Sequence, residues 1–132
     1  MKLTEAIMLA ETAKKEASAR GEKLAIAVFD ENSSLLAFQN MDIDDTACIA
    51  YAQEKALTAL RLGCDTASMA YLVKKPDGIL VNLRYDSSIC LMGGGKLIMR
   101  DGKVTGALGV SGAAEAVDAQ IAECAAEAFL HN

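Results

Sequence analysis

Residues 93–112 read GGGKLIMRDGKVTGALGVSG, a stretch that holds seven of the ten glycines in this 132-residue chain. At its centre, apolar residues lead into Asp101-Gly102 and resume beyond it, which is typical of a β-hairpin with a type I′ turn. The second arm continues through Gly106 and Gly109, whose missing side chains leave room above the sheet. The stretch predicts a hairpin beside a space that either a ligand or a closely packed part of the chain fills.

The stretch ends at Ser111-Gly112, directly before an alanine-rich helical segment. A strand that enters a helix in this way exposes backbone N–H groups at the helix start, where an anion or a carboxylate can bind. The simpler interpretation makes Ser111 the N-cap of that helix. The sequence leaves both interpretations open.

The composition favours a single domain over residues 1–132, since 52% of the residues are hydrophobic and 23% are charged. No apolar run approaches the roughly 18 residues of a membrane span, and the N-terminal residues are too charged for a secretory signal. The net charge of −5 without a basic cluster disfavours nucleic acid as a partner. We therefore expect a cytoplasmic protein without membrane or nucleic-acid contacts.

Apolar periodicity and punctuating residues divide the chain into helices and strands. Helices are expected at 4–20, 47–62, 67–74 and 113–130, capped in the first three cases by Thr4, Thr46 and Thr66. Strands are expected at 24–29, 34–40, 88–92 and on both sides of Asp101-Gly102, while 79–84 is either a strand or an irregular turn. This order predicts an α+β fold, in which helices pack on an antiparallel sheet of about five strands.

Catalytic signatures are scarce. The single histidine, His131, is next to the last residue, so a Ser-His or Cys-His nucleophile pair has no internal base. The glycines match neither a phosphate-binding loop nor a dinucleotide fingerprint. The four cysteines, which form no C-x-x-C pair, are expected to be free thiols rather than ligands of a metal. No catalytic residue and no metal site is predicted.

Lys55 and Asp118 each fall within an expected helix. Charged residues are mostly exposed, so the simplest expectation is that both are solvated. If either is buried it must be paired, and it then becomes a candidate for a functional site.

The glycine stretch, the following Val110-Ser111-Gly112 and Asp118 resemble the GlcG/HbpS-like family, which includes the C-terminal domain of PduO-type corrinoid adenosyltransferases. Residues 50–66 and 24–41 are similar to the second helix and the first hairpin of that family. The resemblance covers essentially the whole chain. It implies a profilin-like layered fold, a homo-oligomer and a pocket for a small molecule or a tetrapyrrole near the glycines. By position, the ligand-binding residues implied are Lys55, Gly93, Gly94, Gly95, Ser111, Gly112 and Asp118.

The sequence departs from haem-binding members of the family at one position that matters for iron. Some of those members have a histidine in the first-hairpin turn, where this chain has Ser33 and Ser34. No internal histidine can therefore ligate haem iron, although other side chains are able to do so.

Three functional hypotheses follow. The first is a cytoplasmic, oligomeric small-ligand-binding protein, an accessory or sensor protein whose ligand is haem or a corrinoid such as cobalamin. The second is an accessory enzyme in which Lys55 and Asp118 act as acid and base on a small carboxylate. The third is a structural assembly subunit whose glycines only permit close packing. The lack of a catalytic constellation favours binding over catalysis.

Overall fold

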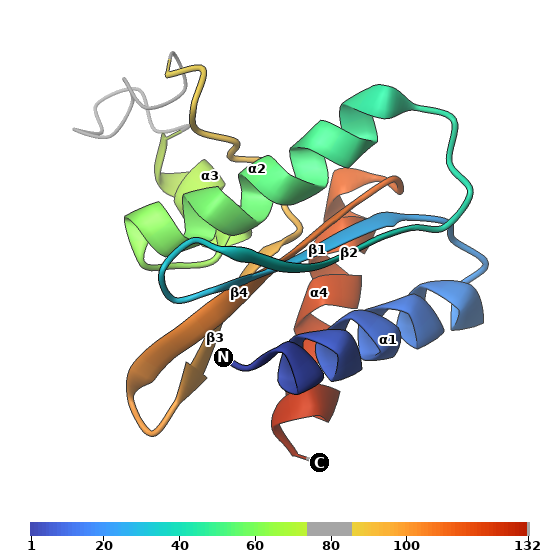
Figure 1. Cartoon of the computed structure of the whole chain (residues 1–132). Helices are drawn as coiled ribbons and strands as arrows, with labels where there is room; N and C mark the ends of the chain where they lie inside the picture. The colour runs from blue at the N-terminus through green and yellow to red at the C-terminus, as the bar shows by residue number, and fades with distance from the viewer. Residues whose placement is uncertain (74–85, 132) are drawn as a thin grey trace.

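The computed structural model describes residues 1–73 and 86–131, which form four helices and a four-stranded sheet (Figure 1). The helices are α1 (Leu3–Ala19), α2 (Thr46–Leu62), α3 (Thr66–Val73) and α4 (Glu115–Leu130). The strands are β1 (Ala25–Asp30), β2 (Leu35–Asn40), β3 (Gly95–Arg100) and β4 (Lys103–Ser111). The α+β fold class predicted from the sequence is confirmed.

The sheet has the order β2-β1-β4-β3, and all of its neighbouring strands are antiparallel. The predicted Asp101-Gly102 turn is confirmed, because both residues have the positive φ angles, 52° and 75°, that a type I′ turn requires. The fully apolar first strand lies in the interior of the sheet, as its sequence predicted.

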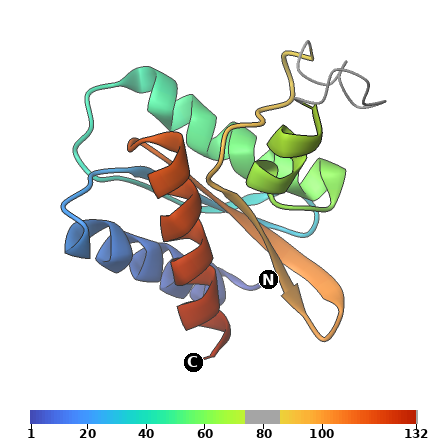
Figure 2. The ribbon, with the colours of Figure 1, turned by 180° about the vertical axis from the view of Figure 1, so that it is seen from behind.

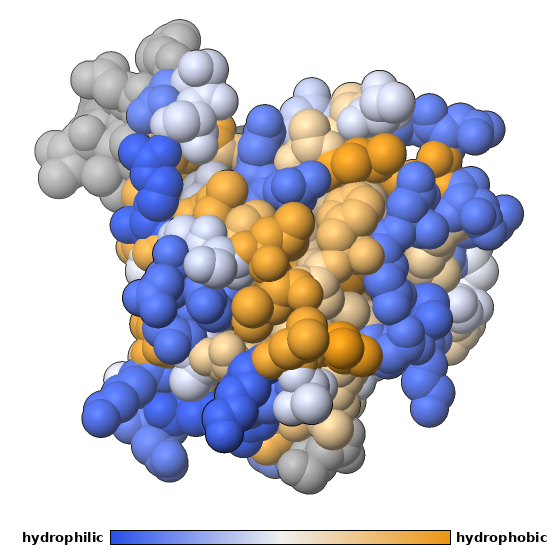
Figure 3. All heavy atoms as spheres, in the orientation of Figure 1, coloured by the Kyte–Doolittle hydropathy of each residue, from blue (hydrophilic) through white to orange (hydrophobic). Residues whose placement is uncertain are grey.

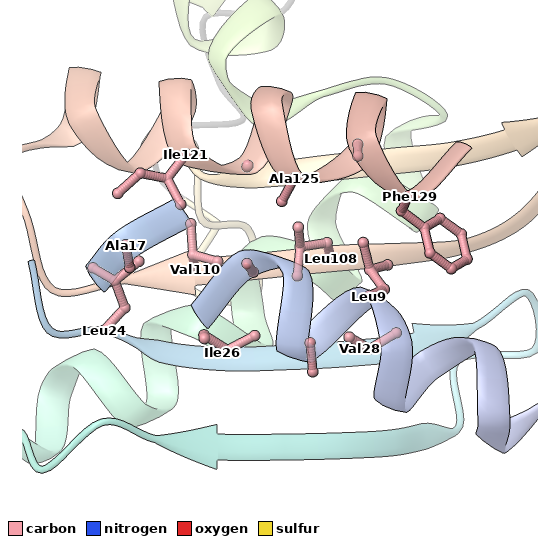
Figure 4. Packing of buried hydrophobic residues seen from close by; sticks show 14 of the residues in the cluster. Leu9, Ala17, Leu24, Ile26, Val28, Leu108, Val110, Ile121, Ala125 and Phe129 are labelled. Carbon is pink, nitrogen blue, oxygen red and sulfur yellow. The ribbon is translucent and has the colours of Figure 1, made fainter. Parts of the chain in front are cut away.

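Helices cover both faces of the sheet, which gives the three layers expected of a profilin-like fold (Figures 1 and 2). On one face, α1 and α4 pack against the larger side chains of β1 and β4, among them Ile26, Val28 and Leu108 (Figure 4). On the other face, α2 packs against small residues of the same strands, including Ala25, Ala27 and Ala107. Both central strands are therefore buried on both sides.

The contact between α2 and β4 leaves no room for a side chain between them. A Cβ atom at Gly109 would overlap the backbone oxygen of Ala52 and crowd the backbone nitrogen of Ala56. The room that Gly109 leaves is thus filled by the backbone of α2 at Ala52 and Ala56, whereas the room at Gly106 is filled by the Phe29 carbonyl and the Met1 side chain.

Some predicted details are wrong. The segment 88–92 is irregular rather than a strand, because the Cys90 N–H donates to Thr58 Oγ1 and the Met92 carbonyl accepts from Thr66 Oγ1. Asp45, not Thr46, caps α2, and α1 begins at Leu3, before Thr4. The predictions for 79–84, and for the last residue of the 67–74 helix, lie outside the described residues.

Candidate functional site

Gly93, Gly94 and Gly95 are buried where the beginning of β3 meets three helices. A Cβ at Gly93 would crowd Glu115 and Ala119 of α4, and one at Gly95 would overlap the backbone of Lys55 in α2. Gly94 has a φ of 126°, a conformation that favours glycine, and its Cα faces Lys55 Nζ and Asp118. The three glycines let α2, α4 and β3 converge on one point.

Lys55 lies at that point and is almost completely buried, with 1% of its surface exposed. Its ammonium group donates to the Val110 carbonyl at 2.9 Å and lies 3.2 Å from Asp118 Oδ2. The expectation of a solvated lysine is wrong, since the alanines around Lys55 place its stem against the sheet. The alternative, a buried and paired lysine, is what the structure shows.

Asp118 is the partner of Lys55 and is 2% exposed. Its second oxygen, Oδ1, accepts a hydrogen bond from the Ala113 N–H at 3.0 Å. One interpretation of the sequence placed a bound carboxylate at the start of the last helix. A carboxylate is bound there, but it is the side chain of Asp118 and not a ligand. Ser111 is not the N-cap of α4, because β4 extends through it and Ala114 takes that position.

Burial raises the pKa of the Asp118 carboxyl above its ordinary value, because the charged form loses its hydration. The Lys55 ammonium and the N–H groups of Ala113 and Gly112 act in the opposite direction and offset part of the rise. The Asp118 carboxylate is therefore hydrogen-bonded by neighbouring donors and shielded from solvent.

The structure brings most of the predicted site residues together, but it leaves little space among them. Lys55, Gly94 and Asp118 are in mutual contact, Gly93 and Gly95 are beside them, and Ser111 is buried at the end of β4. Gly112 is exposed. Whether these residues bind a ligand stays a prediction.

A small cavity of about 190 Å³ does border the glycines. Its lining includes Gly94, Gly95 and Lys96, with Asp65 and Glu123 opposite. Lys96 Nζ lies 2.9 Å from Asp65 and 2.8 Å from Glu123, so the charges of this cavity already neutralise one another. The cavity is below the roughly 300–1,000 Å³ of typical ligand pockets.

A larger groove of about 900 Å³ lies elsewhere, between the end of α1, the loop that follows it and the end of β2. Its lining comprises Lys14, Lys15, Ser18, Gly21, Glu22, Lys23, Gln39, Asn40, Met41 and Asp42. We call this space the α1–β2 groove. The sequence does not reveal this groove directly, because its residues come from two segments that only the hairpin brings together. The lysines near the end of α1 were the available signal.

One buried polar atom at the α1–β2 groove lacks a partner. Gln39 Nε2 donates to Glu11 at 2.8 Å, but Gln39 Oε1 accepts no hydrogen bond from any residue in the ranges 1–73 and 86–131. Unpaired buried acceptors are uncommon in folded proteins. Gln39, which lines the groove, therefore carries a buried amide oxygen without a hydrogen-bond partner among the described residues.

The family model of the haem degrading protein HbpS-like family matches residues 1–127. The chain belongs to this family. The resemblance identified from the glycine stretch is thereby confirmed.

Solved structures agree with the assignment to the HbpS-like family. Protein ORFY from Klebsiella pneumoniae is 27% identical, with a TM-score of 0.91 over 100% of this chain and 92% of ORFY. A PduOC–haem complex is 23% identical, with a TM-score of 0.87 over 97% of this chain and 94% of that one. A double mutant of HbpS from Streptomyces reticuli is 24% identical, with a TM-score of 0.86 over 97% and 86% of the two chains. A comparison with curated proteins gave no match.

Two further observations concern metal ions and membranes. Within the described ranges, no group of three or more His, Cys, Asp or Glu side chains is arranged to hold a metal ion. None of the helices in those ranges is long and apolar enough to cross a bilayer.

Proposed function

We propose that this HbpS-like protein binds haem in the α1–β2 groove and that it does so as a cytoplasmic homo-oligomer. The observation that carries the proposal is the groove itself, in a family described as haem degrading and with a structural neighbour, PduOC, that binds haem. A volume of about 900 Å³ lies within the range of pockets that enclose cofactors.

The residues of the groove fit the chemical parts of haem. Lys15 and Lys23 offer ammonium groups for the two propionates, whereas Lys14 Nζ already lies 2.8 Å from Glu11. Met41 offers a thioether, which is an established axial ligand of haem iron. Haem bound there would supply a redox-active iron. Met41 would hold the iron and the lysines would hold the propionates, without a histidine in the first-hairpin turn.

The cytoplasmic location is supported by the cysteines. Cys48, Cys64, Cys90 and Cys124 are all free thiols, the state that a reducing compartment maintains. Cobalamin receives no such support, because haem is the tetrapyrrole in the one ligand complex among the relatives described above.

The enzyme hypothesis finds less support in the geometry. Lys55 and Asp118 are buried, and each is engaged by the other and by backbone groups. An acid and a base need access to the proton that they transfer. A binding protein does not need this pair to be open.

Titration of the haem-free protein with haemin tests the proposal. A shift of the Soret band with saturation at one haem per site is expected for the wild type. Met41→Ala should change the position of the band and weaken binding, whereas Met99→Ala, an exposed methionine outside the groove, should have neither effect. Wild-type protein without any shift would rule out haem binding.

The same titration distinguishes the two positions for the ligand. Ser68 lines the small cavity beside the glycines, so Ser68→Phe fills that cavity without touching the α1–β2 groove. We expect Ser68→Phe to bind haem like the wild type. If it loses binding while Met41→Ala retains it, the ligand lies at the glycines and the groove assignment is wrong.

A further inference from the structure

Strand β2 forms one outer edge of the sheet. The Met41 N–H donates to the Leu24 carbonyl of the neighbouring chain segment, and the register pairs Gln39 with Ile26. Because backbone groups alternate in direction along an antiparallel strand, the N–H groups of Phe38 and Asn40 point outward. Among the described residues, β2 pairs only with β1.

At the other edge strand, β3, the chain covers the outer backbone groups with its own residues. The Leu97 N–H donates to Asp65 and the Gly95 N–H donates to Thr66, so the segment before α3 covers β3. Lys96 and Arg100 add charges to the same strand. Covering segments and charges are the devices that keep edge strands from pairing with other chains.

Strand β2 carries none of these charges. Its sequence, LLAFQN, contains no charged residue and no proline. Leu35 is 47% exposed, and Leu3, Ile7 and Met8 of α1 are exposed to a similar degree. In the space-filling view, a hydrophobic band crosses the face on which Figure 1 shows β2 and α1 (Figure 3). An uncharged edge strand with apolar surface beside it can pair with a strand of another chain.

We propose that the outer edge of β2 pairs in antiparallel orientation with β2 of a second copy of this chain. A two-fold axis makes the surface complementary to itself, because each outward N–H meets a carbonyl of the same strand in the other copy. The net charge of −5 opposes most contacts between copies, whereas β2 brings two neutral surfaces together. The proposal gives the homo-oligomer proposed above a defined surface and does not depend on haem.

The pairing also affects the α1–β2 groove. Gln39 and Asn40, at the end of β2, line that groove. Antiparallel pairing places the beginning of one β2 opposite the end of the other, so the partner's first hairpin borders the groove. The acidic turn at Asp30 would then lie near Lys15 and Lys23, with charges of opposite sign, whereas the neighbouring Glu31 already pairs with the Met1 ammonium group.

The test measures molecular mass in haem-free protein by light scattering coupled to size-exclusion chromatography. Leu35→Lys places a charge on the β2 edge, and Met99→Lys is its matched control, since Met99 is 44% exposed on the opposite edge strand. We expect the mass of Leu35→Lys to fall to half of the wild-type value or less, while that of Met99→Lys is unchanged. Ile7→Lys, on the flanking helix, should act like Leu35→Lys.

Hydrogen exchange gives an independent readout. The amides of Phe38 and Asn40 should exchange more slowly at high protein concentration than after dilution, because only the dimer protects them. A monomeric wild type, an unchanged mass in both Leu35→Lys and Ile7→Lys, or exchange at Phe38 and Asn40 that ignores concentration would each overturn the proposal. None of these results depends on whether haem binds, so haem binding and β2 pairing fail separately, whereas a monomeric wild type would also overturn the homo-oligomer proposed above.

Discussion

Lys55 Nζ lies 3.2 Å from Asp118 Oδ2, with both side chains almost fully buried beneath Gly94. The two residues are 63 positions apart and join α2 to α4 through the end of the sheet. A buried pair of this kind is not in itself strong evidence of stability, but removing one partner leaves a charge without compensation.

Lys55→Met should therefore destabilise the fold strongly, by about 3–5 kcal/mol. The double variant Lys55→Met/Asp118→Leu should recover a large part of that loss, because no buried charge remains. Urea unfolding followed by circular dichroism measures both. Equal stability of Lys55→Met and the wild type would mean that the pair contributes nothing to the fold.

The raised pKa of Asp118 predicts a specific pH dependence. Between the ordinary value of 3.8 and the raised folded value, the folded protein binds more protons at this site than the unfolded chain does. Stability contributed by Asp118 is thus present at low pH and is lost as the pH rises through that window. Compared with Asp118→Asn, the wild type should lose stability from pH 4 upward. If the wild type instead becomes more stable relative to Asp118→Asn as the pH rises, the effect of Lys55 on the pKa of Asp118 is larger than the effect of burial.

Gly109→Ala should be among the most damaging small substitutions, because the added methyl group meets the backbone of α2 and no side chain can move aside. We expect a loss of about 3 kcal/mol or more, at the upper end for overpacking. Gly63→Ala is the control. It introduces only left-handed strain at a position with open space around it, and should cost about 1 kcal/mol. Thermal unfolding of the two variants compares them directly, and similar losses would contradict the close contact.

Thr66→Val should weaken the attachment of the glycine stretch. The Thr66 hydroxyl accepts from the Gly95 N–H at 3.0 Å and donates to the Met92 carbonyl at 2.7 Å. Valine has nearly the same shape but leaves both buried groups unpaired, a loss of about 1–3 kcal/mol. Thr66→Ser keeps the hydroxyl and should retain more stability than Thr66→Val. If the two variants unfold at the same urea concentration, the hydroxyl is not responsible.

The sequence predicts well wherever the signal is local. Asp101-Gly102 fixes the second hairpin, and the apolar run before Asp30 marks a central strand, because both follow from neighbouring residues. The segment 88–92 fails for the opposite reason. Its composition suits a strand, but two of its backbone groups form hydrogen bonds with the side chains of Thr58 and Thr66, which belong to helices distant in the sequence.

The candidate site shows the same division. The sequence singled out the glycines, Lys55 and Asp118 as candidates, yet it could not show that the two charged residues meet, because their pairing depends on tertiary packing. The alanines at 52, 56 and 59 were an available sign that α2 would approach Gly109 of β4 closely. For the α1–β2 groove, the lysines near the end of α1 were a weaker sign, because they do not show which segment lies opposite them.

The direct backbone contact between α2 and β4 also restricts how these two elements can move relative to each other. With Ala52 resting on Gly109, the helix has no layer of flexible side chains on which to slide, so α2 and the central strands move as one piece. If haem binds as proposed, we expect any accompanying rearrangement to occur in parts of the fold that rest on deformable side chains. Helix α1, which rests on Leu9 above Ile26 and Val28 and borders the groove, is the part free to adjust.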